Sequence, residues 1–100
     1  MPVVPEGIDI TDNQAAHRYE LRVDGALGAL AVYELHPGRI VFTHTETKDG
    51  FEGRGLAGRL AAFALDDARA RNLVVVPRCP YIAEFIRRHP EYEDLTAAPR

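Results

Sequence analysis

The stretch Phe51-Glu52-Gly53-Arg54-Gly55-Leu56-Ala57-Gly58 lies between a segment rich in β-branched residues and an alanine-rich segment of helical character. Its three glycines within six residues leave a turn with few side chains, so backbone N–H groups can converge on a ligand. The helix expected after it adds the positive end of its dipole. Bare amides beside a helix N-terminus are typical of a site for anionic oxygens, above all a pyrophosphate. The stretch therefore predicts a strand–loop–helix junction that binds phosphate.

The residues after this loop predict a helix, a strand and a second helix. Leu56 to Arg71 carries apolar residues at helical spacing, which predicts an amphipathic helix. Leu73 to Val76 is short and wholly apolar, as in a buried strand. The second helix is expected over Tyr81 to His89, because Pro80 suits a first helical position and Pro90 ends the helix.

Three strands are predicted before the loop. Residues 18–24 alternate between apolar and polar types, residues 27–35 are mostly apolar, and residues 39–46 are rich in β-branched side chains. Asp24-Gly25 and His36-Pro37-Gly38 are turn signals between these segments. The whole order favours an α+β fold, in which an antiparallel β-meander is followed by α-β-α on a mixed sheet.

Length, charge and cysteine content bound the class of protein. The 100 residues fit one small domain over residues 1–100, with an ordered core over about residues 8–95. A net charge of −3 and a pI of about 5.7 argue against binding nucleic acid through a basic face. No apolar run approaches the roughly 20 residues that span a bilayer, and the N-terminus lacks a signal-peptide pattern, so no membrane segment is expected. A single cysteine excludes an internal disulfide and favours a cytoplasmic location.

The strand over residues 39–46 carries the first candidate catalytic groups. Alternation would place Ile40, Phe42, His44 and Glu46 on one face, so that an imidazole and a carboxylate stand together just before the loop. Either group could accept a proton, directly or through water. The alternative interpretation is a solvent-facing polar pair at the end of a strand.

Cys79 and Arg54 are the other candidates. Cys79 precedes a helix that opens with Pro80, and a helix N-terminus lowers the pKa of a thiol. The alternative for Cys79 is a small buried hydrophobic residue. Arg54 could reach a phosphate, or it could be a solvated surface arginine. The loop matches neither a Walker A motif nor a dinucleotide-binding fingerprint. The remaining histidines lack metal-ligand spacing, so no metal site is expected.

Three motifs in this order resemble a known family, the YjdJ-type branch of the GNAT N-acetyltransferases, whose members are very short. The motifs are His44-Thr45-Glu46, the loop over residues 51–57, and the block from Cys79-Pro80-Tyr81 to His89-Pro90. The likeness covers most of the chain, from about His17 to Leu95. It implies acetyl-CoA as cosubstrate and an amine as acceptor, with no metal.

The resemblance also implies residue roles at the cofactor site. The superfamily loop pattern, Arg/Gln-x-x-Gly-x-Gly/Ala, falls on residues 52–57, where Glu52 departs from the first position and cannot donate a hydrogen bond as Arg or Gln would. The strand ending at Glu46 would pair with pantetheine and splay from the strand ending at Val76 to admit the thioester. The implied cofactor contacts are Thr45, Glu52, Gly53, Arg54, Gly55, Leu56, Ala57, Gly58 and Tyr81.

In the mechanism implied by this resemblance, an amine attacks the acetyl carbonyl directly. Glu46 or His44 would be the base, and Cys79 would be either the acid or a transient acyl carrier. Larger members have two further helices that form much of the acceptor site, whereas this chain joins its first strands by a short turn. The acceptor pocket is therefore expected to be shallow, or to be completed by a second subunit, such as a homodimer partner, or by the substrate itself. Two other interpretations remain: a non-catalytic CoA-binding module, and a plain α+β domain whose glycines close a turn.

Overall fold

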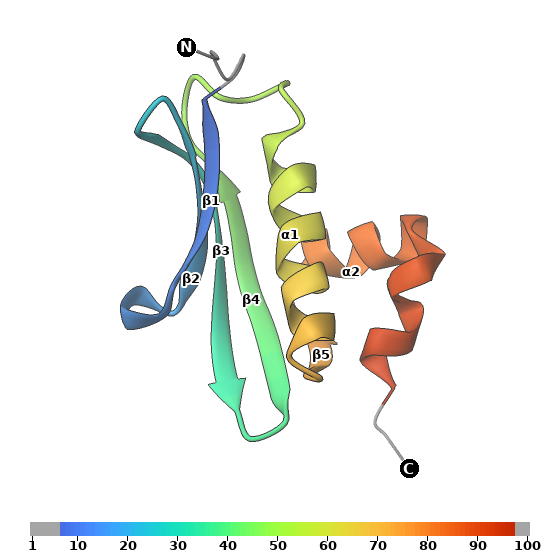
Figure 1. The fold of residues 1–100 in the computed structure, drawn as a ribbon. Helices are drawn as coiled ribbons and strands as arrows, with labels where there is room; N and C mark the ends of the chain where they lie inside the picture. Colours follow the sequence, from blue (N-terminus) through green and yellow to red (C-terminus); the bar gives the residue numbers. More distant parts are fainter. Residues whose placement is uncertain (1–6, 98–100) are drawn as a thin grey trace.

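The computed structural model describes residues 7–97, which form one sheet with two α-helices and two short 3-10 helices (Figure 1). The strands are β1 (Ile8–Asn13), β2 (Arg18–Val23), β3 (Ala26–His36), β4 (Arg39–Thr47) and β5 (Val74–Pro77). The helices are η1 (Gln14–Ala16), α1 (Leu56–Ala70), α2 (Pro80–Arg88) and η2 (Pro90–Thr96). Within the described residues, no helix is long and apolar enough to cross a membrane.

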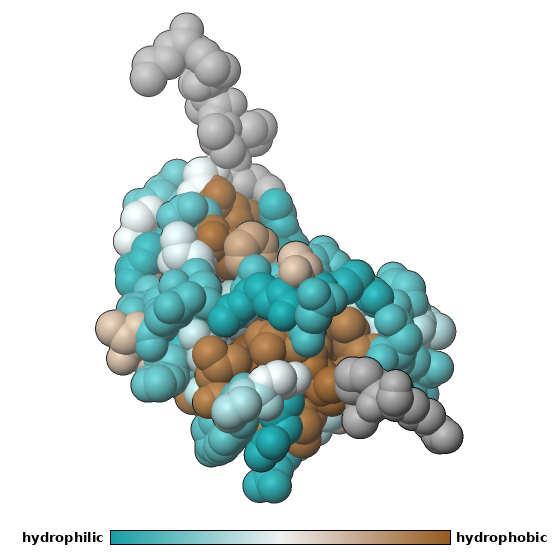
Figure 2. All heavy atoms as spheres, turned by 60° about the horizontal axis from the view of Figure 1, so that its bottom comes forward, coloured by the Kyte–Doolittle hydropathy of each residue, from teal (hydrophilic) through white to brown (hydrophobic). Residues whose placement is uncertain are grey.

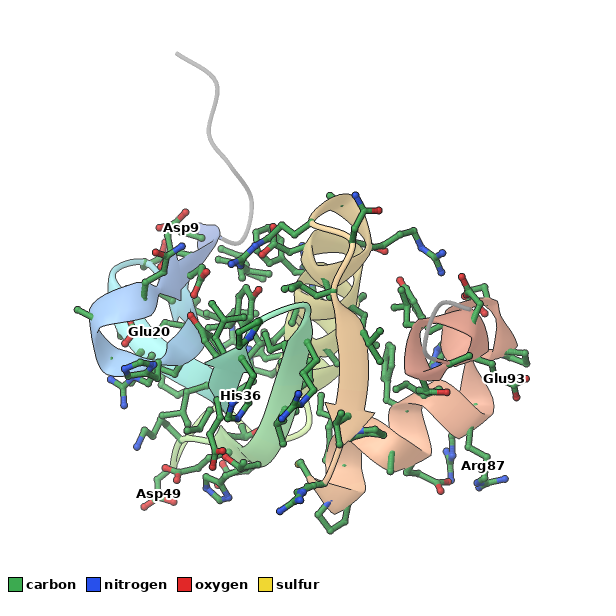
Figure 3. The ribbon with its side chains drawn as sticks, turned by 90° about the horizontal axis from the view of Figure 1, so that it is seen from below. Asp9, Glu20, His36, Asp49, Arg87 and Glu93 are labelled. Atoms are coloured by element: carbon green, nitrogen blue, oxygen red, sulfur yellow. The ribbon has the colours of Figure 1, made fainter. Side chains whose placement is uncertain are left out.

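The sheet is mixed, which confirms the predicted α+β fold. Its strand order is β1-β2-β3-β4-β5, with antiparallel pairing among the first four strands and parallel pairing of β4 with β5. Helix α1 connects β4 to β5 and packs on one face of the sheet, as a parallel connection requires (Figure 1). Seen from below, α2 and η2 lie beside β5, at the far end of the sheet from β1 (Figure 3).

Two strands differ from the predictions. The meander has a further strand at its start, β1, whose Ile8 and Ile10 pair with Val23 and Leu21 and pack against the core. The apolar run before α2 forms β5, but this strand lies at the edge of the sheet and only its Val75 is buried. The apolar character of β5 thus comes from packing under helices rather than from a central place in the sheet.

The core lies between α1 and the sheet. The alternation in β2 is confirmed, because Tyr19, Leu21 and Val23 are buried in this core. On α1 the buried face includes Leu60 and Leu65, whereas Phe63 is 40% exposed. At the lower end of the molecule apolar side chains also reach the surface, bordered by hydrophilic ones (Figure 2). One sheet face and one helix face therefore supply most of the core.

A β-bulge in β4 changes which residues share a face. Tyr33 of β3 pairs with Phe42, but the next residue back, Val32, pairs with His44, so Thr43 is an extra residue in β4. Beyond the bulge, Thr45 lies opposite the buried Ala31 and takes the core side of the strand. The prediction that His44 and Glu46 share a face with Ile40 and Phe42 is therefore wrong. His44 and Glu46 lie on the sheet face opposite α1.

Candidate functional site

The glycine loop has the backbone that its sequence predicts. Gly53 and Gly55 have φ values of 76° and 71°, in the left-handed region that favours glycine. A Cβ added to either residue would meet nothing within 4 Å, so conformation rather than crowding requires glycine here. Gly55 is the N-cap of α1 and has no capping side chain. The first amides of α1, from Leu56 to Gly58, have no acceptors within the helix and can receive an anion.

A glycine that sequence reasoning missed holds this loop against the sheet. A Cβ on Gly28 of β3 would lie 3.2 Å from side-chain atoms of both Phe51 and Leu56, the residues that flank the loop. The carbonyl of Gly28 also accepts a hydrogen bond from the backbone N–H of Lys48 at 2.8 Å. Gly28 therefore permits the close approach that positions the loop. Only the packing across the sheet identifies its role.

The two charged side chains of the loop face solvent. The carboxylate of Glu52 accepts a hydrogen bond from the N–H of Gly50 at 2.9 Å, so it caps the preceding turn. The guanidinium of Arg54 lies over the ring of Phe51, 5.6 Å from its centroid. Arg54 is thus an exposed cation on the loop, and Glu52 helps to shape the turn that leads into it.

A groove of about 800 Å³ begins at the loop and runs between α1 and the segment formed by α2 and η2. Its wall on α1 consists largely of small residues, whereas its wall on α2 and η2 is aromatic. Phe85 stacks on His89 with ring centroids 4.0 Å apart, and the ring centroids of Tyr81 and Tyr92 lie 6.5 Å and 6.1 Å from that of Phe85. The lining residues are Gly55, Gly58, Arg59, Ala62, Tyr81, Glu84, Phe85, Arg88, His89, Glu91 and Tyr92.

The parallel pairing of β4 with β5 ends close to the start of α2. Pairing of β4 with β5 runs from Arg39 opposite Val74 to Phe42 opposite Pro77. The N–H of Cys79 then donates to the carbonyl of Phe42 at 2.8 Å, after which the chain turns into α2. Within residues 7–97, the remainder of β4 pairs with β3 alone. An opening in the sheet therefore follows Phe42, at the N-terminus of α2.

Cys79 borders this opening. It is the N-cap of α2, as the helix prediction implies, and it is only 3% exposed. Its Sγ lies 3.2 Å from Oγ1 of Thr45, which comes from the core side of β4. The structure therefore brings together two of the predicted site residues, Thr45 and Cys79, and buries the thiol.

His44 and Glu46 form a second pair, on the other face of the sheet. Nε2 of His44 lies 3.2 Å from Oε1 of Glu46, and Nζ of Lys48 donates to Oε2 of Glu46 at 2.6 Å. Lys48 first and His44 second hold the pKa of Glu46 below its usual range. His44 is 59% exposed at its side chain and Glu46 is 41% exposed. Glu46 is therefore an accessible carboxylate that keeps its negative charge, and the exposed imidazole of His44 lies beside it.

Tyr81 completes the set of predicted residues. Its ring lines the groove, and a Cβ on Gly58 would lie 3.6 Å from its hydroxyl. Burial first, and the neighbouring Cys79 second, raise the pKa of Tyr81, so its phenol keeps its proton. A neutral phenol at this position can donate a hydrogen bond or a proton into the groove. Among the described residues no cluster of histidine, cysteine and acidic side chains suits a metal ion.

This fold and this loop define an acyltransferase architecture, and the chain belongs to the GCN5-related N-acetyltransferase family, whose model matches residues 18–95. The protein called Protein NATD1 in Bos taurus is 33% identical over 85 residues, which cover 83% of this chain and 75% of that protein. Protein NATD1 of Homo sapiens is 32% identical over the same length, with the same coverage of each chain.

A similar fold is found in a solved structure of low sequence identity. It is a ribosomal-protein-alanine N-acetyltransferase from Brucella melitensis biovar Abortus 2308, with a TM-score of 0.55 and 24% identity. The match covers 83% of this chain but only 62% of that one. The present chain therefore shares the fold while spanning less than two-thirds of the length of that protein.

Proposed function

We propose that this protein is an acetyl-CoA-dependent N-acetyltransferase that acts on an amine, with acetyl transfer at the opening between β4 and β5. One observation carries the proposal: a glycine loop at a helix N-terminus leads directly into a groove, and the other wall of this groove, α2, begins where the pairing of β4 with β5 ends. Family membership supports acetyl transfer in general. The three motifs of the sequence further support the YjdJ-type branch, and the single cysteine supports a cytoplasmic location.

The residues present suit a CoA-like ligand. The amides at the start of α1, together with Arg54, would hold the pyrophosphate. The groove between α1 and the aromatic side chains of α2 would take the flat adenosine portion. The backbone of β4 beyond Phe42 would pair with the amides of pantetheine. When bound, acetyl-CoA supplies an activated acyl group, and the chain supplies orientation and proton transfer.

The side chain that removes the proton from the amine would lie on the sheet face opposite α1. Glu46 is accessible, charged and fixed between His44 and Lys48, so it can accept the proton directly or through water. His44 is the other candidate for this role. Because both side chains lie opposite α1, the amine would approach from that face while the CoA-like ligand lies on the helix side.

Two groups can supply the proton that the departing thiolate needs. Tyr81 lines the groove and stays protonated, and Cys79 lies at the opening. If Tyr81 is the acid, Tyr81→Phe lowers kcat at least tenfold and leaves the affinity for CoA nearly unchanged. If Cys79 is the acid or an acyl carrier, Cys79→Ala has that effect instead.

A non-catalytic CoA-binding module is the second candidate. The observation that favours it is the separation of His44 and Glu46 from Cys79 onto different faces of the sheet. In that case Glu46→Gln and His44→Ala leave both CoA affinity and biological function intact. Under the enzyme proposal at least one of these changes abolishes transfer to amines while CoA still binds.

The first test is calorimetric titration with acetyl-CoA. We expect micromolar binding to the unmodified protein and its loss in Gly55→Val, because a β-branched residue is strained at a φ of 71° and would distort the start of α1. Gly38→Ala is the matched control, since Gly38 has a φ of 75° in the turn between β3 and β4 at the other end of β4 (Figure 1). It should lose stability but keep affinity. Absence of binding up to millimolar ligand would refute both CoA-based functions.

A further inference from the structure

We propose that the contact between Thr45 and Cys79 limits the acyl group to about two carbons, so that the protein selects acetyl-CoA over longer acyl-CoA molecules. This inference rests on the proposed function, because it assumes that the thioester lies at the opening between β4 and β5. It assigns a specificity role to the two side chains, separate from any part that they take in the chemistry.

The contact spans the opening just beyond the last strand pair. Thr45 reaches it from the core side of β4, and Cys79 reaches it from the N-cap of α2. Their Oγ1 and Sγ atoms lie 3.2 Å apart, which is hydrogen-bond contact for a hydroxyl and a thiol. Cys79 is only 3% exposed, so protein atoms surround its thiol.

Neither side chain can withdraw easily, because the backbone at both ends is fixed. The N–H of Cys79 donates to Phe42 at 2.8 Å, and its carbonyl accepts from Ala83 at 3.0 Å within the first turn of α2. Thr45 lies opposite Ala31 in the β3–β4 ladder. A longer acyl chain could therefore enter only by moving a paired strand or a helix N-terminus.

The expected preference for acetyl-CoA over a longer acyl-CoA follows from the number of extra methylenes in the longer acyl group. One surplus methylene in a closed apolar site typically changes recognition by about 10- to 200-fold. Butyryl-CoA has two more methylenes than acetyl-CoA, so we expect it to bind at least about tenfold more weakly. Free CoA, which has no acyl group, should bind about as well as acetyl-CoA.

The experiment measures dissociation constants for CoA, acetyl-CoA and butyryl-CoA by calorimetry, so it does not depend on catalysis. Cys79→Gly and Thr45→Ala each remove one side of the contact. Glycine is well tolerated at an N-cap, and Cys79 makes no capping hydrogen bond through its side chain. Cys79→Ser and Thr45→Val are matched controls of nearly unchanged volume. Circular dichroism confirms that each variant is folded.

We expect the ratio of butyryl-CoA to acetyl-CoA dissociation constants to fall at least about tenfold in Cys79→Gly or Thr45→Ala, and to stay high in both controls. Equal affinity of the unmodified protein for both acyl-CoA molecules would overturn the inference while leaving the proposed function intact. So would a ratio that none of the variants changes. Failure of CoA itself to bind would instead refute the proposed function and this inference with it.

Discussion

At the scale of single residues, the charge on Glu46 depends on its neighbours. Lys48 and His44 lower its pKa, so the carboxylate remains ionised to more acidic pH than an isolated glutamate. A base must be unprotonated to act, so activity should be present above this pKa and lost as pH falls through it. The acid limb of the pH–rate profile therefore reports which side chain is the base.

Lys48→Met tests this dependence. Removal of the ammonium that lies 2.6 Å from Glu46 should return the pKa of Glu46 toward its ordinary value, so the acid limb of kcat/KM moves to higher pH. Initial rates measured between about pH 4 and pH 8 would show the shift. An acid limb that does not move in Lys48→Met would assign the role to His44 instead.

A second prediction at this scale concerns Glu52. Its carboxylate places a negative charge on a loop proposed to bind pyrophosphate, so Glu52→Gln should tighten binding of CoA about two- to fivefold at low salt. Glutamine keeps an oxygen that can accept from the N–H of Gly50, so the turn should be preserved. Titration at two salt concentrations checks this, because the gain should shrink as salt screens the charge. A weaker complex would show that the carboxylate is needed for more than the turn.

At the scale of secondary-structure elements, the loop depends on how closely it packs on β3. Gly28→Val would push against Phe51 and Leu56, which flank the loop, because even a Cβ at this position lies 3.2 Å from each. We expect CoA affinity to fall at least tenfold and stability to fall by about 1–3 kcal/mol. Titration below the melting temperature measures the first effect, and urea unfolding measures the second. Unchanged affinity would mean that the loop does not need this packing.

Element types could be predicted from sequence wherever the pattern was periodic. The alternation of Tyr19, Leu21 and Val23, and the helical spacing after Leu56, both reflect burial on one face, and the structure has these elements. The strand β1 was missed although Ile8 and Ile10 alternate with polar residues, because the segment is short and ends in turn-forming residues.

The sheet face on which His44 and Glu46 lie could not be predicted from the periodicity of the sequence. It depends on the bulge at Thr43, and threonine is an ordinary strand residue that gives no sign of an extra position in the ladder. The bulge emerges only when β4 is paired with β3. Gly28 is similar, since its importance lies in side chains about 25 residues further along the chain that pack on it.

At the scale of the whole molecule, two tyrosines join the sheet to the C-terminal half of α1. Tyr19 and Tyr33 each donate a hydrogen bond of 2.6 Å, to Asp67 and Asp12 respectively. Arg71 lies 3.3 Å from Asp67 and 3.4 Å from Asp12, so it links the two carboxylates. Burial first, and these carboxylates second, raise the pKa of both tyrosines.

Tyr19→Phe and Tyr33→Phe should each lower the free energy of unfolding by about 1–2 kcal/mol, because each leaves a carboxylate without its phenol partner. Tyr81→Phe is the control and should change it by less than about 0.5 kcal/mol, since the Tyr81 side chain is 39% exposed. Urea unfolding at neutral pH measures these values. A loss in the control equal to that in the others would show that the buried hydrogen bonds are not the cause.

The raised pKa values also predict how stability depends on pH. A tyrosine whose pKa is higher in the folded state stabilises that state below the unfolded pKa of about 10, and this contribution is lost as pH rises above it. The protein should therefore unfold more readily in alkaline solution. The steepness of that loss should decrease in Tyr19→Phe, as unfolding at several pH values between about 9 and 11 would show.

The opening after Phe42 has Thr45 and Cys79 on one side and His44 and Glu46 on the other. If acetyl-CoA and the amine reach this opening from opposite faces of the sheet, each can bind and dissociate while the other stays bound. Initial-rate plots for the two substrates should then intersect rather than run parallel. Free CoA should compete with acetyl-CoA and leave the apparent affinity for the amine unaffected, so accumulated product would slow the reaction without displacing the acceptor.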